Sequence, residues 1–120
     1  MITIREEQMD ALNLAYYRRQ CVKFVKEELQ LFDYIIPEQE IQSLFEQFYP
    51  LIDIKNRDDR LTLILLMLAS LAFHEIYTQQ AIMGFMDKSM TSGDRRNSLQ
   101  HMLLEDVGYN SEFLYRKSWI

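Results

Sequence analysis

The hydrophobic pattern of this chain is dominated by one apolar run that has no polar face. Between Leu61 and Phe73 no residue is charged, and Thr62 and Ser70 are the only hydroxyl-bearing side chains. An α-helix turns once in about 3.6 residues, so a helix made of this run must be covered on every side. The pattern predicts a buried central helix over about 58–88, more polar after His74, that other segments surround.

The segment before residue 33 carries apolar residues at helical spacing. Thr3 and Glu6 have the spacing of a capping box, which predicts that a long first helix begins there. Its apolar face drifts around the helix, as is typical of a helix that crosses several neighbours. The apolar positions, in order, are Met9, Leu12 and Tyr16, then Tyr17, Cys21, Phe24, Val25, Leu29 and Phe32.

A second helix is predicted between the first helix and the apolar run. Proline suits the first turn of a helix and is disfavoured in its interior, which indicates a helix over 37–49. Asn56 or Arg57 then precedes Asp58 and Asp59, whose carboxylates favour the positive end of a helix dipole. The central helix should therefore begin at this point.

The last predicted helix covers about 95–107. Ser92 or Asp94 is placed to cap its start, and Gly108 stands where a left-handed residue commonly ends a helix. Residues 109–120 form an aromatic-rich tail that docks either on the bundle or on a partner.

These elements predict an all-α protein. The chain of 120 residues is long enough to bury a core, and its 3 glycines and 2 prolines are few for an all-β fold. We expect one domain, residues 1–120, folded as a bundle of about four helices around the central one.

Composition excludes some classes of partner. A net charge of −5 argues against a nucleic-acid partner, because such binding relies on cationic side chains. The basic pairs Arg18-Arg19 and Arg95-Arg96 have acidic residues nearby and are expected to be solvated. The apolar run is too short for a membrane span, no signal peptide is visible, and the lone Cys21 suits the reducing cytoplasm.

No motif for catalysis, a cofactor or a metal is complete. His74-Glu75 begins like a zinc-protease helix, but the position that needs a second histidine is Thr78. A di-iron site needs Glu three residues before a histidine, where this chain has Leu71 and Ser98. We therefore assign no catalytic, cofactor or metal residue and expect a protein that is not an enzyme. A small helical enzyme or metal protein stays open as an alternative.

Two groups of side chains are candidates for binding a protein partner, because methionine and aromatic residues are favoured in interface cores. One group follows the central helix and the other lies in the tail, where folding back onto the bundle would use the same residues. The candidates are Met83, Phe85, Met86, Met90, Phe113, Leu114, Tyr115, Trp119 and Ile120.

Three groups of residues in the chain occur in a recognisable order. They are Ile4, Glu7, Gln8, Met9 and Ala11, then Phe73-His74, then Ser92, Gly93, Asp94, Arg95, Arg96 and Leu99. This order resembles that of small all-helical proteins encoded beside bacterial type VI secretion effectors. The chain departs from that pattern because 76–83 lacks an Asp-Pro and because 109–120 is additional.

The resemblance implies an accessory role, such as an adaptor or chaperone that holds a secreted effector. No binding or catalytic residue is transferred by it. The alternative is an immunity protein that covers the active site of a cognate toxin, since a charge of −5 suits a basic partner. Self-association stays open.

Overall fold

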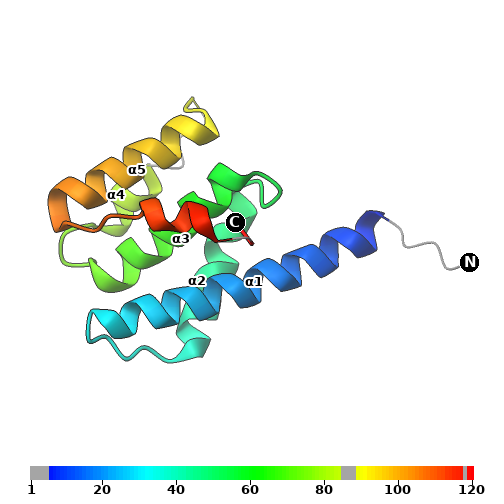
Figure 1. Ribbon diagram of the computed structural model, residues 1–120, viewed down its shortest axis with the longest axis horizontal. Helices are drawn as coiled ribbons and strands as arrows, with labels where there is room; N and C mark the ends of the chain where they lie inside the picture. The colour runs from blue at the N-terminus through cyan, green and yellow to red at the C-terminus, as the bar shows by residue number, and fades with distance from the viewer. Residues whose placement is uncertain (1–5, 85–88, 118) are drawn as a thin grey trace, which may run out of the picture.

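All regular elements of the described chain are helices (Figure 1). The computed structural model describes residues 6–84, 89–117 and 119–120, with the side chains of 6–10, 79 and 115 left out. The predicted all-α class is confirmed. The elements are α1 (Glu6–Leu31), α2 (Glu38–Phe48), a 3-10 turn η1 (Tyr49–Leu51), α3 (Arg57–Ala72), α4 (Gln79–Gly84), α5 (Ser92–Val107) and a second 3-10 turn η2 (Glu112–Arg116).

Helix α3 forms the centre of the bundle, as its apolar run predicts. Leu61 and every residue of 63–69 are fully buried. Helices α1, α2 and α5 all pack against α3, and Figure 1 shows α3 (green) between α1 (blue) and α5 (orange). A helix without a polar face is thus covered from several directions.

The predicted extent of the central helix, 58–88, is wrong beyond Ala72. Phe73 leaves the helical conformation with φ −121° and ψ 29°. The N–H groups of Ile76 and Tyr77 then both donate to the carbonyl oxygen of Phe73, at 3.0 and 2.9 Å. The chain therefore turns away from the axis of α3. Residues 85–88 lie outside the described part.

Tyr77 supplies a physical reason for this turn. Its ring is buried, and its hydroxyl donates to Asp106 of α5 at 2.9 Å. Thr78 follows and caps the next helix, because its Oγ1 accepts from the N–H of Ala81 at 3.2 Å. A contact with a distant helix therefore outweighs the local preference to continue α3.

The ends of the other helices lie close to their predicted positions. Helix α2 begins one residue after Pro37, and Asn56 caps α3 by accepting from the N–H of Asp59 at 3.2 Å. Gly108 ends α5 in the left-handed conformation, with φ 72°. The cap of α5 is Thr91, however, and not Ser92 or Asp94. Thr3 of the predicted capping box lies outside the described residues.

Two ion pairs connect the start of α3 to the start of α5. Asp59 faces Arg95 at 3.8 Å and both are buried, while the more exposed Asp58 lies 3.0 Å from Arg96. The expectation that Arg95-Arg96 is a solvated pair is therefore wrong. Consecutive residues of one helix pair with consecutive residues of the other, which fixes how the two helices sit against each other.

The N-terminal half of α1 projects from the bundle (Figure 1). The described molecule is elongated, with extents of 53 × 34 × 27 Å. The second half of α1, from Cys21 to Leu29, carries the buried residues of this helix. In the first half, Leu14 still packs against the core, whereas Leu12 and Tyr16 are exposed, so the apolar face is only partly covered there.

Candidate partner-binding site

The aromatic tail folds back onto the bundle. Leu114 and Ile120 are buried in the core, so neither side chain is available to a partner in this structure. Phe113 and Trp119 are half-buried, and their rings lie 6.0 and 6.1 Å from the ring of Phe24 on α1. Figure 1 shows this red segment against the middle of α1. The side chain of Tyr115 lies outside the description.

Arg60 holds the tail from inside the bundle. Its guanidinium is buried, donates to the carbonyl oxygen of Ile120, and donates to that of Ile54 at 2.8 Å. The same group lies over the ring of Tyr17, 4.5 Å from its centre. One cation thus connects the tail, the loop before α3 and the middle of α1.

The methionine group is only partly visible. Met83 on α4 is exposed, while Met90 is partly buried and accepts a hydrogen bond from Arg95 through its carbonyl oxygen at 3.4 Å. Phe85 and Met86 lie outside the described residues. Met83 is therefore the member of this group whose exposure the structure supports.

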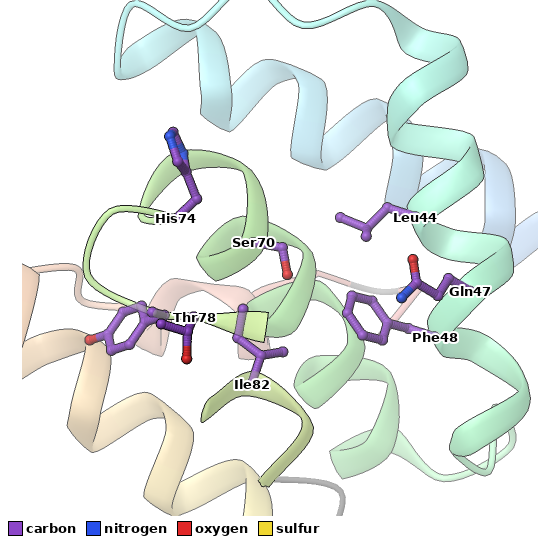
Figure 2. Close-up of a pocket in the computed structure, with 8 residues that line it drawn as sticks. Leu44, Gln47, Phe48, Ser70, His74, Thr78 and Ile82 are labelled. Atoms are coloured by element: carbon purple, nitrogen blue, oxygen red, sulfur yellow. The ribbon is translucent and has the colours of Figure 1, made fainter. Parts of the chain in front are cut away.

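A pocket of about 270 Å³ lies between α2 and the α3–α4 turn (Figure 2). Figure 2 shows Phe48 of α2 facing Ser70 and Ile82, whereas His74 points away from them. The sequence did not single out this pocket, because its walls come from three helices that meet only in the fold. Its lining residues are Leu44, Gln47, Phe48, Ser70, His74, Tyr77, Thr78 and Ile82.

The hydroxyl groups of this pocket are engaged by the fold itself. Ser70 donates to the carbonyl oxygen of Leu66 at 2.8 Å, and the hydroxyl of Tyr77 donates to Asp106. None of the described residues that line the pocket carries a carboxylate. Its walls are mixed, with Leu44, Phe48 and Ile82 as the apolar members, and its engaged hydroxyl groups suit contact with a partner side chain better than acid–base chemistry.

Two other kinds of site are absent from the described residues. They contain no cluster of three or more His, Cys, Asp and Glu side chains that could hold a metal ion. Within the same ranges, none of the helices combines the length and the apolar character that crossing a membrane requires.

Cys21 of α1 is fully buried in the core. Burial raises the pKa of its thiol from 9.0 to about 12, although Arg60 lowers it in part. Thiols react as thiolates, so the geometry disfavours a nucleophilic role for this residue.

We expect Cys21 to react with a thiol reagent roughly 10³-fold more slowly in the native protein than in denaturant, because reaction requires opening. The raised pKa means that the folded state binds the thiol proton more tightly than the unfolded state does. This contribution to the free energy of unfolding is complete below pH 9 and is lost between pH 9 and 12. The reaction of the thiol should therefore accelerate over that pH range. Stopped-flow absorbance with a disulfide reagent measures both. A Cys21→Ser, Ser98→Cys variant, with its thiol on the exposed face of α5, is the fast-reacting control. Equal rates for wild type and control would contradict the prediction.

The exposed apolar stripe of α1 was missed as a site. Leu12 is 62% exposed and Tyr16 is 40% exposed, and the Tyr16 ring meets that of Tyr17 edge-on at 5.6 Å. The signal was present in the spacing: nine residues separate Leu12 from the buried Cys21, which corresponds to opposite faces of a helix. Leu12 and Tyr16 could therefore not be buried in the same core as Cys21.

A smaller apolar group is exposed where α1 meets the turn before α2. Its members are Leu31, Tyr34 and Ile35, and Asp33 between them has a left-handed backbone with φ 63°. This group lies at the far end of α1 from Leu12.

No known family model matches the chain, and neither the curated proteins nor the solved structures contain a significant match.

Proposed function

We propose that the protein is a non-enzymatic adaptor or chaperone that holds a secreted bacterial effector. The observation that supports this proposal is the projecting half of α1, on which Leu12 and Tyr16 remain uncovered by their own fold. Apolar and aromatic side chains that a monomer leaves exposed together commonly mark protein-binding surfaces. The effector as partner follows from the resemblance to type VI accessory proteins. Met83, Phe113 and Trp119 are further candidate contacts.

Co-expression with the products of the adjacent genes tests this proposal. We expect one of them to co-purify with the wild type, and Leu12→Ser with Tyr16→Ser to reduce its recovery at least tenfold, at a stability change of about 0.5 kcal/mol or less per site. Leu104→Ser, on the exposed face of α5, is the matched control and should retain the partner. A monomeric protein that captures none of these products would contradict the proposal. Sedimentation as a dimer would instead indicate that a second copy of the chain covers Leu12 and Tyr16.

A second candidate is an immunity protein, which the net charge of −5 favours because an acidic protein associates rapidly with a basic toxin. Co-expression should then restore growth to cells that produce the adjacent toxin. Adaptor function predicts capture without rescue.

A further inference from the structure

The cations of the described chain divide into paired and unpaired groups. Arg19, Lys23, Arg116 and Lys117 make no ion pair with a carboxylate of the described part. No salt bridge within the described fold neutralises these four charges, although Lys117 is close enough to Glu28 to lower the pKa of that carboxyl in part. Elsewhere the pairs are Arg18 with Glu46, Lys26 with Glu38, Arg95 with Asp59 and Arg96 with Asp58.

Two of these cations, Lys23 and Lys117, lie together where the tail meets α1. Lys23 of α1 and Lys117 of the tail line one depression of about 130 Å³. The depression is also lined by Gln20, Phe24, Glu27 and Trp119, so one carboxylate stands beside the two ammonium groups. The ammonium of Lys117 lies 5.4 Å from the centre of the Phe24 ring. Arg116 precedes Lys117, so docking of the tail adds its charges to those of the helix.

The same side of α1 carries the exposed apolar pair. Leu12, Tyr16, Arg19 and Lys23 follow one another at spacings of four, three and four residues, and all four are exposed. Such spacing places them on one face of a helix, over a length of about 16 Å. We call these four residues the α1 outer face; Glu27, one turn further, ends its basic part.

We propose that the α1 outer face and Lys117 bind an acidic amphipathic segment of a protein partner. The inference rests on the proposed function and adds the chemistry of the partner. Apolar side chains of that segment contact Leu12 and Tyr16, and its carboxylates lie opposite Arg19, Lys23 and Lys117. The basic patch on a protein of net charge −5 orients such a segment, since the remaining surface repels it.

Tyr16 is well placed to act as an anchor. Its ring is supported edge-on by Tyr17, whose own ring is covered by the buried guanidinium of Arg60. An aromatic side chain that is held before binding loses little freedom on association.

The observations favour a protein segment over an anionic membrane. A helix that lies on a membrane inserts a broad apolar face, but the broad apolar face of α1 is buried in the core through Cys21, Val25 and Leu29. Among the described side chains on this side of α1, the exposed apolar ones are Leu12 and Tyr16, which suits a narrow contact with a partner helix.

Selection from a library of random peptides long enough for about three helical turns tests this inference on the full chain. We expect the enriched peptides to carry acidic residues together with apolar residues at spacings of three and four. Their affinity, measured by fluorescence anisotropy, should fall as salt is added, because exposed charges are screened.

Charge reversal then locates the binding surface. Arg19→Glu and Lys23→Glu should each weaken an enriched peptide by roughly threefold to tenfold. Ser98→Glu combined with His101→Glu on exposed α5 positions changes the net charge as much as one reversal and should leave the affinity unchanged.

Three outcomes would overturn the inference: no enrichment, enrichment without acidic residues, or affinities that Arg19→Glu and Lys23→Glu leave intact. Binding to phosphatidylcholine vesicles that contain phosphatidylserine, without peptide enrichment, would replace the protein segment with a membrane. If Leu12→Ser with Tyr16→Ser abolishes effector capture but both charge reversals preserve it, the adaptor function stands and only the acidic partner fails.

Discussion

Replacing Asp59 with alanine is expected to lower the free energy of unfolding by about 3–5 kcal/mol. Asp59 is 4% exposed and Arg95 is 8% exposed, so the substitution removes the carboxylate that faces a buried guanidinium. It also removes the acceptor of the Asp53 N–H, which lies 2.8 Å from Oδ2 of Asp59. Urea denaturation followed by circular dichroism measures the change.

Asp58→Ala is the matched control. Asp58 and Arg96 form the neighbouring pair, but Asp58 is 36% exposed at its side chain and water can replace the partner. An exposed ion pair contributes about 0–1 kcal/mol, so this variant should unfold close to the wild type. Equal losses from Asp58→Ala and Asp59→Ala would show that burial does not separate the two pairs.

Alanine substitutions around α3 are expected to cost about 2–5 kcal/mol each. The four consecutive positions Leu63, Ile64, Leu65 and Leu66 point in different directions around the helix, and all four are fully buried. Each truncation therefore removes packed apolar surface and leaves a cavity. Thermal and urea unfolding of the four single variants measure the losses.

Leu104→Ala on α5 is the control for this series. Leu104 is 47% exposed, so its truncation should change stability by about 0.5 kcal/mol or less. If one of the four α3 variants lost as little, the face of α3 at that position would be open, and the bundle would not enclose the helix as described.

The sequence predicted the enclosed helix and most helix ends because those features depend on local patterns. An apolar run without a polar face must be buried, whichever segments bury it. Asn56, Pro37 and Gly108 determine helix ends because they act on the backbone beside them. The interruption at Phe73 depends instead on the bond from Tyr77 to Asp106, 29 residues further along the chain. No local pattern could reveal it.

The candidate site was predicted less well than the fold, and for a similar reason. Phe113, Leu114, Trp119 and Ile120 are the kind of residue that binds partners, but the same chemistry serves a tail that docks on its own bundle. The exposure of Leu12 and Tyr16 depends on how far the bundle extends along α1. The pocket between α2 and the α3–α4 turn is lined by segments that are far apart in the sequence, so no local pattern indicates it.

The hold of Arg60 on Ile120 has a consequence for synthesis in the cell. Ile120 is synthesised 60 residues after Arg60, so this contact forms only after the tail has left the ribosome. Before α5 and the tail emerge, α3 can pack against α1 and α2 only. The leucine-rich surface of α3 that α5 later buries is exposed to water during this time. The nascent chain should therefore be a substrate for ribosome-bound chaperones after α3 has emerged, and protected from them once α5 has packed and the tail has docked.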